Sequence, residues 1–178
     1  MTVITPWNPG AGPLLLEGMK QQTRVRAGVA VAAVLGADAL IHLYWSTGAT
    51  WPAQGAREVS LAVLDFEVPF TPRVLLPLVA LLCAGALVML ASVDRLGGLG
   101  RRIPGRVLRL GTSAIAAATL LRGLLGVVWA LGYGTQTWTP FYWLNLLLYT
   151  PLCLMLFAAT RAAAGAGAAK AAASPRPS

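Results

Sequence analysis

Four long apolar segments, separated by loops that carry most of the charged residues, set the strongest limit on how this 178-residue chain can fold. A window of about 19 residues places them near residues 27–45, 74–93, 107–131 and 141–160, each long enough to cross a hydrocarbon core of about 30 Å. Backbone groups cannot stay unpaired in lipid, and the segments lack the two-residue alternation of barrel strands. The sequence therefore predicts an all-α membrane protein, a bundle of four transmembrane helices within residues 27–160.

The composition excludes several classes of protein. Hydrophobic residues make up 57% of the chain and charged residues 11%, whereas a soluble domain carries about 25% charged residues. The net charge of +8 comes from scattered arginines, which argues against a disordered chain and against a nucleic-acid-binding module. The abundance of Ala, Gly, Leu, Pro and Arg is typical of a GC-rich genome. We therefore expect a multi-pass protein of a bacterial plasma membrane, with the lipid bilayer as its main partner.

No common cofactor signature occurs in the chain. The sequence has no C-x-x-C, H-E-x-x-H, P-loop or G-x-S-x-G motif, so we predict no metal and no cofactor, and we assign no catalytic residue. Both cysteines, Cys83 and Cys153, fall in apolar runs and are expected to be small packing residues.

Basic residues divide the connections between two sides of the membrane. The loop at residues 132–140 has no basic residue. The segments before the first span, between the second and third spans and after the fourth span are basic, and they carry in turn Lys20, Arg24 and Arg26; Arg95, Arg101, Arg102 and Arg106; and Arg161, Lys170 and Arg176. The positive-inside rule then predicts a cytoplasmic N-terminal segment, residues 1–26, and a disordered cytoplasmic tail, residues 161–178. The alternative is a signal peptide cleaved after Ala37-Asp38-Ala39, although that stretch stays apolar through Leu43.

Aromatic residues collect on the side that the charge rule places outside. Six of them are candidates for an aromatic vestibule in which an apolar or amphiphilic ligand stacks: Tyr44, Trp45, Trp51, Trp129, Trp138 and Trp143. The alternative is an interfacial belt with aromatic packing that holds two loops onto the bundle. The first outer loop has about 28 residues, and we expect a loop of this length to pack as a cap over the outer end of the bundle. The alternative is a contact of Asp65-Phe66-Glu67 with a cationic headgroup.

Five polar residues lie inside the spans, where a charge costs about 2.5–3.5 kcal/mol. They are Asp38, His42, Arg122, Asn145 and Tyr149. Counted from the outer helix ends, Asp38, Arg122 and Tyr149 fall about 9–10 Å deep, and His42 and Asn145 form a shallower layer. The second span has few polar residues, and we interpret it as lipid-facing. The other three spans then meet, and we predict an ion pair between Asp38 and Arg122.

Two interpretations of this polar cluster stay open. The ion pair either fixes only the order and register of the helices or shapes a functional site. His42 titrates near neutral pH and can relay a proton or act as a general acid or base, unless it is an interfacial histidine bonded to a loop carbonyl. Pro151 is predicted to kink the fourth helix beside Tyr149.

Three short motifs point to a known family. They are H-x-Y-W at residues 42–45, R-G at residues 122–123 and Y-T-P-L-C-L at residues 149–154. On these motifs the chain, over residues 25–160, resembles a bacterial family of small four-helix membrane proteins described only as a domain of unknown function. The resemblance implies the four-helix fold and supports the choice of site residues, and it implies no activity.

We expect a module that binds a lipid-like or small amphiphilic molecule from the outer leaflet, with aromatic walls and Arg122, His42 and Asn145 as polar contacts. One alternative is a membrane-embedded enzyme that uses His42 and Asp38 as an acid–base pair. A second alternative is a component of a proton-coupled transporter, with Asp38 as the relay.

Overall fold

The computed structural model describes residues 11–172 of the chain, with the side chains of residues 16–164, and this part is helical without any strand. The elements are α1 (Ala11–Ser46), α2 (Ala56–Leu64), α3 (Pro72–Ser92), α4 (Gly97–Arg101), α5 (Gly105–Ala130), α6 (Pro140–Leu144), a π-helical turn η1 (Asn145–Tyr149) and α7 (Thr150–Ala172). Four stretches are long and apolar enough to span a membrane: Leu16–Ser46, Pro72–Ser92, Gly105–Ala130 and Pro140–Ala164. The predicted all-α fold with four apolar helices is confirmed.

Helix α1 and helix α7 both extend beyond the spans expected from the sequence. Helix α1 begins at Ala11, so most of the predicted N-terminal segment continues the first span as one helix. Helix α7 runs to Ala172, past the point at which we expected a disordered tail. Alanine has the highest helix propensity, and residues 162–172 are mostly alanine, which explains the extension. The remaining ends, residues 1–10 and 173–178, lie outside the described residues.

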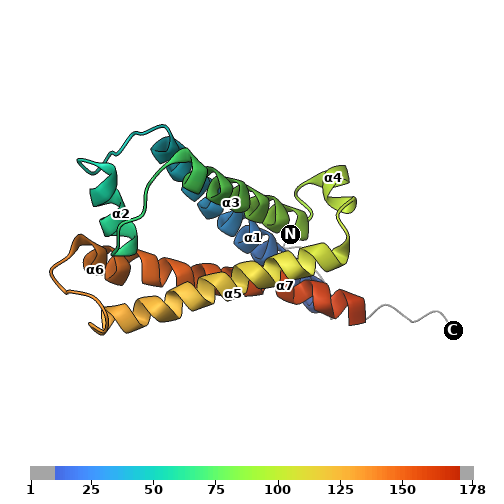
Figure 1. Ribbon diagram of the computed structural model, residues 1–178. Coiled ribbons are helices and arrows are strands. Elements are labelled where there is room, and N and C mark those ends of the chain that lie inside the picture. Colours follow the sequence, from blue (N-terminus) through green and yellow to red (C-terminus); the bar gives the residue numbers. More distant parts are fainter. Residues whose placement is uncertain (1–10, 173–178) are drawn as a thin grey trace, which may run out of the picture.

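The long helices form two pairs that diverge from a common base. Helix α1 packs along α3, and α5 packs along α7, while α1 also contacts α7 and α3 contacts α5. Figure 1 shows α1 and α3 diverging from α5 and α7 toward the end that carries α2 and α6. We call this the aromatic end, at Ser46, Pro72, Ala130 and Pro140, and we call the opposite end, at Ser92 and Gly105, the arginine end.

One apolar core joins the two pairs, and it lies between the middle of the bundle and the arginine end. Its buried members come from α1, from α3 with the residue that follows it, and from α7: Val31 and Ala32, Met89 and Val93, and Leu156 and Ala163. Beneath this core, Arg24 of α1 donates hydrogen bonds from Nε to the Ala163 carbonyl (2.8 Å) and from Nη2 to the Ser92 carbonyl (2.6 Å). From its charge, Arg24 is expected to orient the protein in the membrane. Its two hydrogen bonds also fasten α1 to α3 and α7.

The structure does not set the second span apart as the lipid-facing one, because α3 packs along α1 and also leaves Leu76, Leu81 and Leu87 exposed. Helix α3 makes the most extensive contact with α1 and buries Leu75, Met89 and Ala91. The absence of polar residues does not single out a lipid-facing helix, because an apolar helix surface suits a lipid-facing and a protein-facing position equally well in a membrane.

The first long loop closes the wide end of the bundle, as expected of a cap. Its helix α2 packs against α6, and Thr135 of the other aromatic-end loop donates a hydrogen bond to Asp65 Oδ2 (2.9 Å). Ser60 is fully buried and holds the turn after α2 by bonds to the Phe66 carbonyl and the Val68 N–H (both 2.7 Å). Glu67 pairs with Arg57 (2.6 Å). Both acidic side chains of residues 65–67 thus have partners within the protein.

Candidate functional site

The most completely bonded polar side chain within the spans is the amide of Asn145, which is fully buried. Its Oδ1 accepts hydrogen bonds from Arg122 Nη1 (3.0 Å) and from Thr150 Oγ1 (3.3 Å), and its Nδ2 donates to the Gly126 carbonyl (2.8 Å). The bond to Gly126 fixes the orientation of the amide, so its oxygen faces Arg122. Asn145 is therefore a support for Arg122 and has no surface left for a ligand.

The local sequence explains how two helices come close enough to build this group. Gly123 and Gly126 of α5 are buried, and a Cβ at Gly123 would meet Leu154 Cδ2 at 2.7 Å. Small residues of this kind let membrane helices approach closely. Pro151 cannot donate a backbone hydrogen bond, and the π-helical turn η1, in which the Thr150 N–H bonds to the Asn145 carbonyl, directly precedes it. The sequence predicts a kink beside Tyr149, and the structure has a π-helical turn at this place.

Arg122 is held between aromatic rings and has no acidic partner. Its Cζ lies 5.0 Å from the ring centroid of Trp129 and 5.6 Å from that of Tyr149. Among the described side chains, no carboxylate lies within 4.0 Å of this guanidinium, since the ion pairs found there are Asp38–His42 and Arg57–Glu67. Asn145 is its protein hydrogen-bond acceptor, and the side chain is only partly buried. The backbone of Arg122 lies about 10 Å below that of Trp129 along α5, and the guanidinium reaches up to the Trp129 ring. Arg122 thus presents a positive charge, and its other N–H groups have no acceptor among the described residues and can bind an anion.

A second polar group lies on α1. His42 Nδ1 lies 2.9 Å from the Asp38 carbonyl oxygen and 3.2 Å from Asp38 Oδ1. Both neighbours are acceptors, so Nδ1 carries the hydrogen and Nε2 keeps its lone pair when the ring is neutral. The His42 side chain is 12% exposed and the Asp38 side chain 47% exposed. This arrangement, with a carboxylate behind the imidazole, is the one that general bases use.

The predicted ion pair between Asp38 and Arg122 does not form. Helix α1 contacts α3 and α7, and helix α5 contacts α7 and α3, so α1 and α5 lie diagonally across the bundle. Helix α7 lies between them, because it contacts both α1 and α5. Asp38 therefore pairs with His42 on its own helix, and Arg122 pairs with Asn145.

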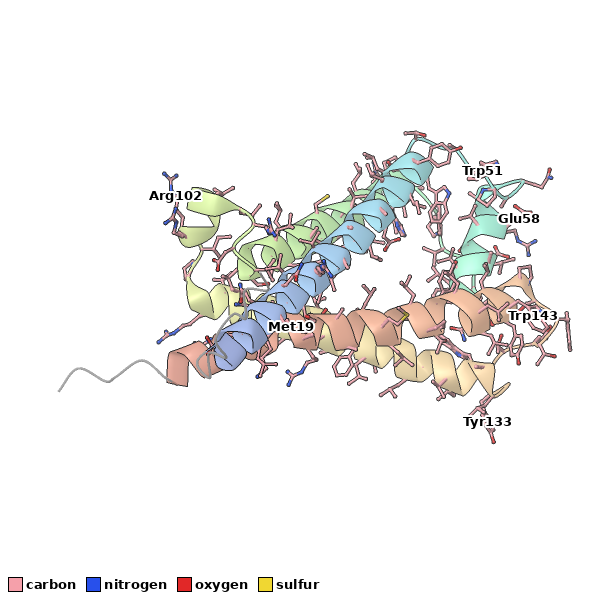
Figure 2. The ribbon with its side chains drawn as sticks, turned by 180° about the vertical axis from the view of Figure 1, so that it is seen from behind. Met19, Trp51, Glu58, Arg102, Tyr133 and Trp143 are labelled. Atoms are coloured by element: carbon pink, nitrogen blue, oxygen red, sulfur yellow. The ribbon has the colours of Figure 1, made fainter. Side chains whose placement is uncertain are left out.

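The six aromatic residues of the predicted vestibule fall into different surroundings. Trp45 packs against His42 (5.3 Å between centroids) and Phe70 (5.7 Å), and its Nε1 donates to the Trp51 carbonyl (3.2 Å). Trp129 packs against Phe141 (5.2 Å), on the other helix pair. The remaining four are exposed at the aromatic end: Tyr44, Trp51, Trp138 and Trp143. Figure 2 shows Trp51 and Trp143 on opposite sides of α2 at this end.

Sequence reasoning did not place Thr150 in the site, and it gave Gly126 only the role of a small residue beside Arg122 that lets another helix come close. The signal for Gly126 was its position one turn beyond Arg122, where a residue without a side chain allows a backbone carbonyl to be reached. Thr150 has no comparable signal beyond its place in the Y-T-P-L-C-L motif, and its hydroxyl bonds to the Asn145 side chain.

The four apolar helices and the polar groups between them define a multi-pass membrane protein. A family model described as "Protein of unknown function (DUF3995)" matches residues 35–160, and the chain belongs to this family. That range includes every polar site residue described above. No curated protein and no solved structure matches the chain.

Proposed function

We propose that this protein binds a lipid-like or small amphiphilic molecule from the outer leaflet and that Arg122 binds its polar head. We also place it in a bacterial plasma membrane, with the arginine end and both termini in the cytoplasm, as the positive-inside rule favours. The aromatic end then faces outward, and the exposed aromatic side chains lie at the level at which an amphiphile enters.

A single observation carries this proposal, the Arg122 guanidinium held by Asn145 and two aromatic rings without a carboxylate beside it. An uncompensated charge within a span is costly, and residues that bear that cost commonly serve a function. The cost falls when an anion binds, because Arg forms paired hydrogen bonds with carboxylate or phosphate groups. The geometry therefore favours an anionic head on an apolar tail.

A binding measurement tests this proposal with a defined probe. The full chain in phosphatidylcholine nanodiscs is titrated with a pyrene-labelled fatty acid or with the matching fatty alcohol, and tryptophan-to-pyrene energy transfer is recorded. We expect the acid to bind about tenfold more tightly, since hydrogen bonds to charged groups are worth roughly 1.5–3 kcal/mol. Arg122→Gln is expected to remove this preference, and Arg122→Lys to keep part of it.

Arg57→Gln is the matched control, because it removes one arginine from the exposed loop and leaves the spans unchanged. Equal binding of acid and alcohol by the unmodified protein contradicts the proposal. So does a preference that survives in Arg122→Gln.

The second candidate is a membrane-embedded enzyme. It is favoured by His42, whose Nδ1 contacts Asp38 and whose Nε2 keeps a free lone pair. Such an enzyme uses this nitrogen as a general base on a substrate in the outer half of the membrane. Cells that produce the unmodified protein and cells that produce His42→Gln are compared by mass spectrometry of their lipid extracts. We expect one lipid class to accumulate and another to disappear in the variant, and identical extracts count against catalysis.

A further inference from the structure

The turn between α3 and α5 gathers positive charge at the arginine end. Residues 93–113 contain one acidic residue, Asp94, and five arginines: Arg95, Arg101, Arg102, Arg106 and Arg109. Neither ion pair found among the described side chains involves any of these arginines. The positive charge at this end is therefore not neutralised by the part of the protein that the structure describes.

Two of these arginines line an open hollow of about 340 Å³, whose other walls are Leu110 and Ser113. The four residues follow one another at intervals of three, one and three, so they share one face of α5. From Arg106 to Ser113 the helix rises by about 10 Å. The volume lies in the range of small-ligand sites, about 300–1,000 Å³.

The hollow lies where the headgroup layer of a bilayer is expected. Helix α3 ends at Ser92 and α5 begins at Gly105, so Arg106 and Arg109 belong to the first turns of a span. Figure 2 shows Arg102, at the tip of this turn, at the opposite end of the molecule from Trp51, Tyr133 and Trp143.

Aromatic residues do not anchor this turn. The chain contains no Phe, Trp or Tyr between residues 71 and 128, so α3, the turn and most of α5 lack the aromatic belt that usually holds helix ends in the interface. Leu99 of α4 is 61% exposed and lies two residues from Arg101, a pattern that suits a segment resting on a membrane surface. Contacts of its arginine side chains with lipid phosphates can anchor this turn in the interface instead.

We propose that the hollow binds the headgroup of one anionic phospholipid, with its phosphodiester between Arg106 and Arg109. Residues three apart on a helix have Cβ atoms about 5–6 Å from each other, which lets both guanidinium groups reach one phosphate. The Ser113 hydroxyl, deeper along the same face, is placed for an ester carbonyl, and Leu110 contacts the first methylene groups. This site is independent of the one at Arg122, because it lies toward the opposite end of α5 and in the other membrane leaflet.

Native mass spectrometry of the full chain tests the proposal. The protein is released from nanodiscs of equal parts phosphatidylglycerol and phosphatidylcholine, and the bound lipids are counted. We expect one phosphatidylglycerol to be retained in preference to phosphatidylcholine. Arg106→Gln with Arg109→Gln is expected to reduce this retention about tenfold, because each arginine supplies charge-assisted hydrogen bonds. Replacing both by lysine keeps the charge, loses the paired geometry and is expected to reduce retention by a smaller factor.

The matched control is Arg101→Gln with Arg102→Gln, which removes the same charge from the same turn but outside the hollow. It is expected to retain phosphatidylglycerol like the unmodified protein, and circular dichroism checks that all variants keep their helical content. An equal loss in both double variants shows attraction by net charge alone and overturns the proposal. Displacement of the lipid by inorganic phosphate also overturns it, since the hollow then binds free phosphate.

Discussion

Asn145→Leu is expected to destabilise the protein by about 2–3 kcal/mol, since three hydrogen bonds are lost and each is worth about 0.6–1.7 kcal/mol within a membrane. Leucine has the same branching at Cγ but leaves Arg122 Nη1 without its acceptor and the Thr150 hydroxyl without its partner. The unfolding midpoint of the purified protein in detergent, followed by tryptophan fluorescence, measures this loss.

Thr160→Val is the matched control for Asn145→Leu. Thr160 lies in the same apolar segment and is fully buried, and its hydroxyl has no hydrogen-bond partner among the residues that the structure describes. Its replacement by the isosteric valine removes a buried polar group without breaking a bond, so we expect an unchanged or slightly higher midpoint. Equal effects of the two substitutions contradict the role given to Asn145.

Gly126→Ala is the second substitution with a large expected effect, a net loss of about 1–3 kcal/mol. A Cβ at this position collides with Thr150 Oγ1 and comes within 3.2 Å of Asn145 Oδ1. Thr150 must then rotate and give up its bond, or α5 and the η1 turn must separate. We expect a lower unfolding midpoint together with weaker binding of the pyrene-labelled fatty acid, because Arg122 loses its fixed support.

Gly36→Ala is its matched control, since a Cβ there meets nothing within 4 Å. Alanine favours a helix over glycine by about 1 kcal/mol, so this substitution is expected to raise the midpoint. A Gly126→Ala protein that is as stable as the unmodified chain contradicts the close packing of α5 against η1.

Sequence alone predicts the spans and the positions of polar groups along them, because these follow from counting residues along a helix. Asp38 and His42 share a face at a spacing of four, and the structure joins them. Which helices become neighbours depends on how apolar surfaces fit together, and no residue count contains that information. The mostly apolar α3 therefore packs beside α1, where the predicted ion pair would place α5.

The partner of Arg122 was missed for a chemical reason. A buried arginine suggests a carboxylate, and Asp38 lies at a matching depth. The observed partner is a neutral amide that gains its orientation from Gly126 and Thr150, two residues with no charge to attract notice. Only the folded structure brings a glycine carbonyl and a threonine hydroxyl together on one side chain.

The single core near the arginine end has a mechanical consequence. The two helix pairs share one packed core, and the contact of α2 with α6 joins their far ends. A wider angle between the two pairs requires little repacking at the aromatic end, because the tightly packed side chains lie in the shared core. A change in the angle between the two helix pairs would thus leave the packed base of the bundle unchanged.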